Sequence, residues 1–456
     1  MIMKDLLLDA SARAVRYVSG IGTRRITPHP EDIARLTALG GPMPEEPCDP
    51  RTVLALLDDI GSPATIASTG GRYFGFVTGA TLPAALAANW IAGVWDQNAG
   101  MRVMSPVGAA LEDITLGWLR EALGLPPSTG VGFVTGATMA NFTCLAAARH
   151  ALLERAGWNV EDNGLFSAPP LTVVVSDEVH VSVLKALSML GLGRTRVTRL
   201  ATDDQGRIKS DSLPAFDDRT IVCIQAGNVN TGAFDPAAQI CAHAYRYGAW
   251  VHVDGAFGLW AAAAPRRANL MAGFADADSW ATDCHKWLNV PYDSGLAFVR
   301  EPQHVRSAMT VSAAYLQASD LREPYQYTPE ASRRARAIEV WAALRSLGRR
   351  GLADMIEGNC RMASRFAGQL RTAGYSILND VVLNQVLVSF GDAAVTKRVI
   401  SELQNEGTCW CGATEWHGQT AMRISVSGWA TTEEDVDQSA AAVLRVAGSV
   451  TQSGAK

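Results

Sequence analysis

Short apolar runs alternate with helical patterns through the middle of the chain. The run VGFVTG at 131–136 is followed by the helical pattern ATMANFTCLAAARHALLERAG, and LTVVVSD at 171–177 is followed by EVHVSVLKALSMLG. Comparable β-branched runs occur further along, at 220–227, 249–255 and 294–300. Strands that alternate with helices are typical of a parallel sheet with crossover helices. The pattern therefore predicts an α/β protein whose large domain covers residues 65–310.

The pattern changes on either side of this region. Beyond residue 310 comes a long helical pattern, followed by the strand-like runs YSILNDVVLNQVLVSFG and AMRISVSGW with helical sequence between them. This order is typical of an α+β unit, so residues 311–456 are predicted to form a small C-terminal domain. Residues 1–64 contain helices broken by GPMPEEPCDP and are predicted to form an N-terminal helical arm that needs another surface to pack on.

Composition excludes several classes of protein. Hydrophobic residues make up 48% and charged residues 19% of the 456, as in a soluble α/β enzyme, and no stretch approaches the ~18 unbroken apolar residues of a membrane span. The first twenty residues have the period of an amphipathic helix rather than of a secretory signal, so we expect a cytoplasmic protein. A formal net charge of −5 argues against binding to nucleic acid. The eight cysteines lack zinc-finger spacing, which predicts reduced thiols and no metal site.

The segment DSWATDCHKWLNVPYDSG contains an unusual lysine. Lys286 lies between His285 and Trp287, close after an apolar run, in a stretch that is otherwise almost free of cations. A lysine that forms a Schiff base with an aldehyde must lose its charge, which burial and a cationic neighbour favour. The alternative is a lysine whose stem lies along the surface while its ammonium group stays in water.

Asp254 is the candidate partner for a cofactor ring. It ends the run AWVHVDG, and a carboxylate at the C-terminal end of a buried parallel strand points into the crevice where ligands bind. The alternative is that Asp254 caps the next helix. The small residues Gly255, Ala256 and Gly258 favour the first interpretation, because they leave room for a group packed against the loop.

Two further features follow strands. VTGATMAN places Thr135 to Thr138 between a strand and a helix, where backbone N–H groups and a hydroxyl would face an anion such as phosphate. His180 follows LTVVVSD and would lie at the rim of the crevice, where a flat imidazole could cover a ring. Taken alone, the turn is more often just a helix cap, and the histidine is more often a surface or capping residue.

Taken in this order, the phosphate turn, the histidine, the strand-end aspartate and the His-Lys pair resemble the group II pyridoxal-phosphate decarboxylases. This family includes aromatic-L-amino-acid and glutamate decarboxylases and has the aspartate-aminotransferase fold, also called fold type I. The resemblance extends over about residues 60–430 and includes HVDGAFG, HKWLNVPYDSG, GNVNTGAFDP and SPVGAALE. It implies pyridoxal 5′-phosphate as the cofactor, a mostly parallel mixed sheet in the large domain, and a small C-terminal domain.

The resemblance also implies roles for particular residues. Lys286 would form the Schiff base, Asp254 would pair with the pyridinium nitrogen and His180 would stack on the ring. The remaining cofactor contacts would come from Ala137, Thr138, Asn228, Ala256 and His285. Two positions depart from the family. Val229 replaces the usual threonine, which leaves Asn228 as the adjacent polar group, and Asp283 replaces an asparagine of the aromatic-amino-acid members.

The reaction implied is decarboxylation of an L-amino acid, with an aromatic substrate favoured, to give the amine and CO2. Phe76 and Thr78 resemble substrate-side positions, and a family loop tyrosine has three possible equivalents here, Tyr315, Tyr325 and Tyr327. Arg423 could hold a carboxylate, or it could belong to a structural ion pair.

Other functions and the assembly are also considered. A carbon–carbon lyase acting on an amino alcohol phosphate, an aminotransferase and a non-catalytic scaffold are the alternatives. For the assembly, a homodimer with active sites at the subunit interface is expected, because the arm lacks a core and WDQNAGMRVMSP at 95–106 resembles a segment near the partner's site.

Overall fold

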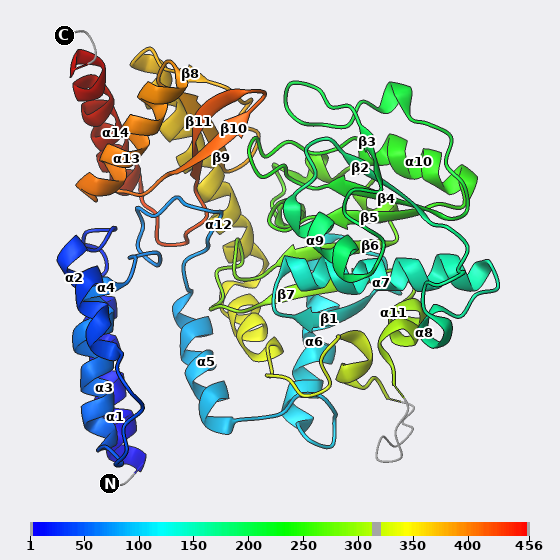
Figure 1. Ribbon diagram of the computed structural model, residues 1–456, viewed down its shortest axis with the longest axis horizontal. Helices are drawn as coiled ribbons and strands as arrows, with labels where there is room; N and C mark the ends of the chain where they lie inside the picture. The colour runs from blue at the N-terminus through cyan, green and yellow to red at the C-terminus, as the bar shows by residue number, and fades with distance from the viewer. Residues whose placement is uncertain (1–2, 312–320, 454–456) are drawn as a thin grey trace.

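The computed structural model describes residues 3–311 and 321–453 and has a large mixed sheet as its centre (Figure 1). The strand order is β1-β7-β6-β5-β4-β2-β3. The strands are β1 (Gly130–Val134), β2 (Thr172–Ser176), β3 (Val197–Leu200), β4 (Thr220–Gln225), β5 (Trp250–Asp254), β6 (Ser279–Asp283) and β7 (Gly295–Val299). Every residue of β1, β4, β5, β6 and β7 is buried, as expected for strands covered on both faces.

Strand β7 is the exception to the parallel order. It pairs antiparallel with both β1 and β6, whereas the other pairs are parallel. The chain between β6 and β7 contains no helix that could carry it back across the sheet, so it returns in the opposite direction. This short return loop carries Lys286.

Helices cover both faces of the large sheet. The helices of this region are α5 (Pro83–Trp95), α6 (Pro106–Leu123), α7 (Ala137–Arg155), α8 (Val160–Asn163), α9 (Val181–Met189), α10 (Ala237–Tyr247) and α11 (Pro302–Met309). Helix α7 packs on β6 and β7 and against α9 and α11. Because α7 begins directly after β1, its N-terminus lies at the same edge of the sheet as Gly295, which pairs with both Val134 and Asp283.

A second, antiparallel sheet lies near the C-terminus (Figure 1). Its order is β10-β11-β9-β8, with strands β8 (Ser376–Ile377), β9 (Gln385–Ser389), β10 (Gly412–Trp416) and β11 (Gln419–Ser425). The helices here are α12 (Ala337–Thr372), α13 (Ala393–Glu406) and α14 (Glu433–Ser453). Residues of α12 belong to the cores of both sheets, and the helix breaks at Gly348, whose φ of 60° favours glycine. The domain boundaries at 64/65 and 310/311 remain our proposal.

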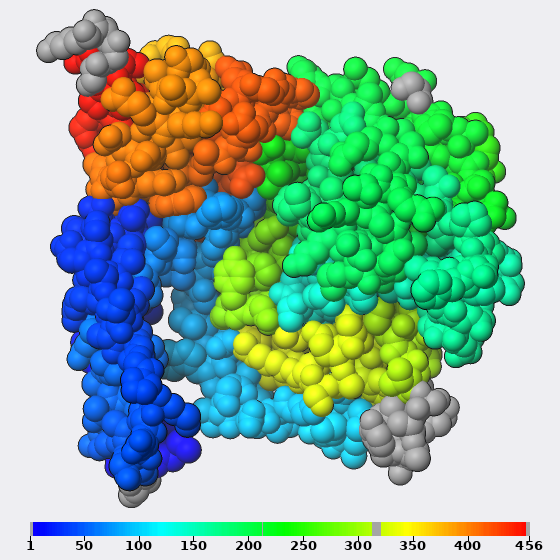
Figure 2. Space-filling model, viewed as in Figure 1, coloured from blue at the N-terminus to red at the C-terminus, as the bar shows by residue number. Residues whose placement is uncertain are grey.

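The N-terminal helices stand beside this body. They are α1 (Met3–Gly20), α2 (Pro30–Arg35), α3 (Pro50–Leu56) and α4 (Ser62–Ala64), and none of them contains a buried residue. Figure 2 shows an open gap between these helices and α5. No helix within 3–311 or 321–453 is long and apolar enough to cross a membrane.

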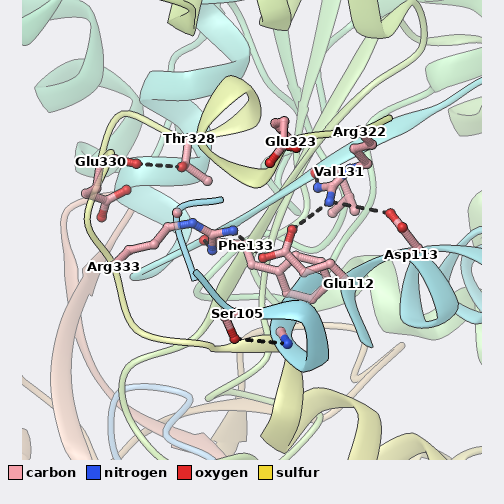
Figure 3. Close-up of polar contacts among 12 residues, drawn as sticks. Ser105, Glu112, Asp113, Val131, Phe133, Arg322, Glu323, Thr328, Glu330 and Arg333 are labelled. Carbon is pink, nitrogen blue, oxygen red and sulfur yellow. Dashed lines mark hydrogen bonds and ion pairs between the residues drawn. The ribbon is translucent and has the colours of Figure 1, made fainter. Parts of the chain in front are cut away.

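A buried ion-pair cluster joins α6, β1 and the segment that precedes α12 (Figure 3). Glu112 of α6 is 1% exposed and pairs with Arg333, whose side chain is also 1% exposed. Glu112 Oε2 accepts a second bond, of 2.7 Å, from Arg322 Nη1. Arg322 and Arg333 also donate to the carbonyl oxygens of Val131 and Phe133, so the cluster ties α6 and the segment before α12 to β1.

We expect Glu112→Ala to lower the free energy of unfolding by about 3–5 kcal/mol, because it leaves two buried cations without their carboxylate. Urea denaturation of the purified protein measures the loss. Asp113→Ala is the matched control: Asp113 is 39% exposed and lies 3.7 Å from Arg322 Nη1, so its loss should cost no more than about 1 kcal/mol. Equal losses in the two variants would contradict the structural role of Glu112.

Candidate active site

Lys286 lies in the return loop between β6 and β7. This loop packs against the segment of residues 72–82, called the strap below. A Cβ added to Gly79 of the strap would come within 1.8 Å of the Lys286 carbonyl oxygen, so only glycine fits there. Asn289 fastens the loop: its Oδ1 accepts from the N–H groups of Ala80 and Trp429, at 3.0 and 2.9 Å. The Lys286 side chain is 17% exposed, which leaves its amine accessible from one side.

Asp283 stands between Lys286 and the start of α7. Its Oδ2 lies 3.0 Å from Lys286 Nζ, and its Oδ1 accepts the Ala137 N–H at 2.5 Å. His285 Nε2 lies 3.4 Å from the same Oδ1. The Asp283 carboxylate thus accepts from one N–H group of the α7 N-terminus, which the sequence predicts to bind a phosphate. Helix α7 has no side-chain N-cap, so the other N–H groups of its first turn remain available to an anion.

Asp254 ends β5 and is 4% exposed. It accepts hydrogen bonds from the Ala256 N–H at 3.2 Å and from Asn141 Nδ2 at 3.4 Å. It does not cap a helix, because the next helical turn begins at Gly258 with no side-chain cap. Within the described ranges Asp254 forms no ion pair with an arginine or lysine. A buried carboxylate of this kind suits a ligand that brings its own cationic N–H.

Sequence reasoning missed the hydrogen-bond chain that orients Asp254. Asn141 lies one turn inside α7, and its Oδ1 is 2.9 Å from His252 Nε2. His252 Nδ1 is in turn 2.9 Å from Ser279 Oγ. Burial lowers the pKa of His252 to about 3, so the imidazole is neutral. Because Asn141 Nδ2 donates to Asp254, Asn141 Oδ1 accepts from His252, which fixes the His252 proton on Nε2.

His180 is both the N-cap of α9 and a member of the site. Its Nδ1 accepts from the Ser182 N–H at 3.3 Å and lies 2.8 Å from Ser182 Oγ. Its pKa is lowered, mainly by burial, against the opposing effect of Asp254; the positive charges of Lys286 and Arg423 lower it further. A neutral imidazole that accepts at Nδ1 carries its proton on Nε2, so His180 has an N–H to offer a ligand.

Arg423 of β11 joins the site from the small sheet. Burial lowers its pKa, and its Nη1 donates to Asn230 Oδ1 at 3.3 Å. No carboxylate of the described residues pairs with it, so the structural ion pair considered from the sequence is not found there. Its positive charge is one of those that lower the pKa of His180.

Aromatic rings gather around Phe76 and Thr78. The Phe76 ring lies 5.2 Å from that of Trp410, and Tyr73 stacks on the same indole at 5.3 Å. Tyr292 stacks on His285 at 4.3 Å. Burial raises the pKa of Tyr73 to about 12 and raises that of Tyr292. Tyr73, Tyr292 and Trp410 were not among the residues expected from the sequence.

A cavity of about 220 Å³ opens beside this aromatic group. Phe76, Trp410 and Arg423 line it, together with residues of α13. Lys286 and His180 do not line it, so the cavity borders the candidate site rather than containing it.

The remaining predicted residues differ in their surroundings. Asn228 Oδ1 accepts from the N–H groups of Asn230 and Thr231, at 2.9 and 3.2 Å, so it stabilises its own turn. Tyr325 and Tyr327 are buried in the body of the protein. The Tyr327 backbone packs against Gly132, and its ring packs near Gly130.

The position of Tyr327 does not favour a substrate contact within its own chain. Gly130 pairs with Val299, whereas Val134 and Gly295 mark the Lys286 end of the same strands. Four residues of strand separate the two ends by about 13 Å. Tyr315 lies outside the described residues.

Comparison with known proteins decides the family. Residues 51–391 match the model of the pyridoxal-dependent decarboxylase conserved domain. The chain belongs to the pyridoxal-dependent decarboxylase family. The predicted family is thereby confirmed, together with pyridoxal phosphate as the cofactor and carboxy-lyase as the enzyme class.

Relatives in this family act on several amino acids. An aromatic-L-amino-acid decarboxylase of Bacillus atrophaeus is 26% identical over 86% of this chain and 84% of its own. An L-tyrosine/L-DOPA decarboxylase of Lophophora williamsii is 27% identical over 73% of this chain and 67% of its own. The crystal structure of Oryza sativa TDC with PLP and tryptamine superposes with a TM-score of 0.89 at 20% identity, covering 98% of this chain and 97% of that one, which confirms the α/β fold.

The residues of this decarboxylase fit pyridoxal phosphate. Lys286 offers an accessible amine, Asp254 a buried carboxylate without a cationic partner, and α7 an N-terminus without a side-chain cap. Asp283 is the one departure, because a phosphate would share the start of α7 with its negative charge. Lys286 Nζ, 3.0 Å from Asp283 Oδ2, is placed to offset that charge.

Proposed function

We propose that this decarboxylase converts an aromatic L-amino acid to its amine and CO2. The observation that carries the proposal is that Asp254 and His180 are joined through hydrogen bonds of Asn141 and Ser182. Lys286 lies against Gly79, in the same segment as Phe76, whose ring lies 5.2 Å from that of Trp410. Aromatic rings prefer offset or edge-to-face contact with other rings, so this group suits an aromatic side chain. A screen of L-amino acids for stoichiometric CO2 and amine tests the proposal.

We assign the cofactor contacts as follows. Pyridoxal phosphate, when bound, supplies an aldehyde carbon that condenses with amines and a pyridine ring that draws electrons from the bond being broken. Lys286 Nζ would hold the aldehyde end and Asp254 the ring nitrogen. The first-turn N–H groups and hydroxyl at Ala137 and Thr138 would hold the phosphate, with Ala256 on the ring face opposite His180. Asn228 is kept as a neighbouring contact through its Nδ2, which has no hydrogen-bond partner among the described residues.

The protein's own groups then orient the substrate and manage protons. Asn141 and His252 hold the Asp254 carboxylate in one orientation, so its negative charge is fixed before the substrate binds. We assign His180 Nε2–H and the Arg423 guanidinium to the substrate carboxylate, because the charge of Arg423 acts on His180. Decarboxylation replaces a Cα–carboxylate bond with a Cα–H bond, so one proton must be delivered to Cα. Lys286 Nζ and His180 Nε2 are the candidate donors.

His180 and Arg423 should differ in their kinetic effects. We expect His180→Phe to keep bound cofactor but to lose at least ~10²-fold in kcat, because phenylalanine can stack but has no N–H. Arg423→Ala should mainly raise KM, since it removes a charge that binds the carboxylate before it leaves. Steady-state kinetics with the identified amino acid measure both. A tolerated His180→Phe, an inactive Arg423→Ala and stoichiometric amino transfer to a 2-oxo acid would identify an aminotransferase instead.

We also propose a homodimer in which the N-terminal helices pack on the second subunit. Apolar side chains on α1 and α5 are exposed: Leu7, Leu8, Val15, Val18, Trp90, Ile91, Val94 and Trp95. Exposed apolar faces of this extent favour a partner surface, and the open gap in Figure 2 leaves room for one. Light scattering at assay concentration should give twice the mass of the chain. A fully active monomer would contradict the proposal.

A cytoplasmic location is part of the same proposal. All eight cysteines are free thiols and seven are buried, as is usual in a reducing compartment. Fractionation of the source cells tests this, and recovery of the protein from an oxidising compartment would contradict it.

A further inference from the structure

A cluster of two histidines and a glutamate lies at the far end of α7, away from the cofactor site. His150 and Glu154 are one turn apart on α7, and His304 comes from α11, which packs beside it (Figure 1). Thirteen residues of helix separate His150 from Ala137, a distance of about 20 Å. The cluster is therefore distinct from the groups that hold the cofactor.

The ligand atoms of this cluster are close together. His150 Nε2 lies 3.5 Å from Glu154 Oε2, and one ligand atom from each of the three residues lies within 4.8 Å of the others. In a tetrahedral zinc site, metal–ligand bonds of 2.0–2.1 Å place neighbouring ligand atoms about 3.3 Å apart. A small rotation of the Glu154 and His304 side chains is enough to bring the three ligand atoms to this separation. Both side chains have solvent-exposed surface, which permits the rotation.

Both histidines present a nitrogen that has no hydrogen-bond partner among the described residues. His150 Nε2 and His304 Nδ1 are buried atoms that form no hydrogen bond with the described residues. The His150 side chain is only 10% exposed. Buried polar atoms in proteins are nearly always satisfied, so two unsatisfied nitrogens aimed at one space point to a missing ligand.

Glu161 completes the arrangement expected around a metal-binding histidine. Its Oε2 lies 2.7 Å from His150 Nδ1 and accepts a hydrogen bond from Nδ1–H, which leaves the Nε2 lone pair for a metal. This carboxylate–histidine pairing recurs in zinc sites, where it fixes the tautomer and strengthens the ligand.

The cations near this cluster are directed elsewhere. Arg149 donates to the Leu190 carbonyl oxygen at 3.2 Å, and Arg155 donates to the Gly248 carbonyl oxygen at 3.0 Å. Neither guanidinium group therefore occupies the space between His150, Glu154 and His304.

We propose that His150 Nε2, His304 Nδ1 and the Glu154 carboxylate bind a zinc-type divalent transition metal. Two imidazoles and one carboxylate match the ligand set of known zinc sites and leave a fourth position for water. The metal would join α7 to α11 and stabilise the contact between them. Residue spacing does not indicate this site, because no cysteine takes part and His304 lies far along the chain from His150 and Glu154.

Titration of the chelator-treated holoenzyme with Zn2+ tests the proposal. Isothermal titration calorimetry should show one site per chain, and Co2+ in the same site should give the intense visible absorption of a tetrahedral complex. His304→Ala and Glu154→Gln should each weaken binding at least ~10-fold, and Glu161→Gln about 10-fold, the lower end for a carboxylate behind a ligand. Mg2+, which prefers all-oxygen sites, should not compete.

Matched controls separate this site from surface binding and from the cofactor. His243→Ala removes a histidine that already bonds to the Pro214 carbonyl oxygen, and it should leave Zn2+ binding unchanged. The cofactor absorbance should be unaltered in every variant, because Lys286 and its neighbours are untouched. Absence of saturable Zn2+ binding, or binding that survives His304→Ala and Glu154→Gln, would overturn the proposal whatever the enzyme's activity.

Discussion

Lys286→Ala abolishes turnover and covalent attachment of the cofactor, while the protein stays folded. The result is expected because Lys286 is the one amine of the described residues within the site, Lys397 lining only the adjoining cavity, and because Asp283 keeps its bond to the Ala137 N–H when Lys286 is removed. Borohydride reduction of the native holoenzyme followed by peptide mapping should place the cofactor on Lys286. Circular dichroism of the variant should match that of the native protein.

Two lysine variants make this test specific. Lys286→Arg retains a cation beside Asp283 but cannot condense with an aldehyde, so it should be as inactive as Lys286→Ala. Lys185→Ala, on the exposed side of α9, should retain full activity. If the cofactor is recovered on another lysine of the native enzyme, the assignment of Lys286 as its attachment site is wrong.

Asp254→Asn should lower kcat by about 10²–10³-fold, the range reported when one preorganised electrostatic group is removed. The amide keeps the size of the side chain but loses the charge that favours a protonated ring nitrogen. Cofactor affinity should fall much less than kcat, because the contacts to the phosphate and to the aldehyde end remain. Rapid-quench kinetics and cofactor titration separate the two effects.

Asp278→Asn is the matched control for Asp254→Asn. Asp278 immediately precedes β6, at the opposite end of the β5–β6 pair, and burial raises the pKa of its carboxyl group. The same chemical change there should leave kcat almost unaltered. If Asp254→Asn releases the cofactor but turns over normally once the cofactor is resupplied, the proposed role of Asp254 in catalysis is contradicted.

The strand-end residues of the site could be predicted because they follow continuous apolar runs. Asp254 ends the buried strand β5, and His180 follows β2, so periodicity alone places both at one edge of the sheet. Strand direction was harder to predict, because nothing in the run at 294–300 marks β7 as antiparallel. Strand β3 was missed because it is a short edge strand with exposed positions that interrupt any apolar pattern.

The interactions missed from the sequence all join residues from different elements. Asn141 and His252 orient Asp254 from α7 and β5, and neither belongs to a motif of its own. Tyr292 was overlooked because its stacking on His285 depends on the path of the return loop. The spacing of these residues along the sequence does not predict their contacts. Folding brings their side chains within a few ångströms of one another.

The most direct test of the proposed reaction is product analysis of the holoenzyme with aromatic L-amino acids. We predict CO2 and the corresponding amine in a 1:1 ratio, with turnover absent in Lys286→Ala and faster for an aromatic L-amino acid than for L-glutamate. An aldehyde with ammonia in place of the amine, a 2-oxo acid without CO2, or no turnover of any amino acid would contradict it.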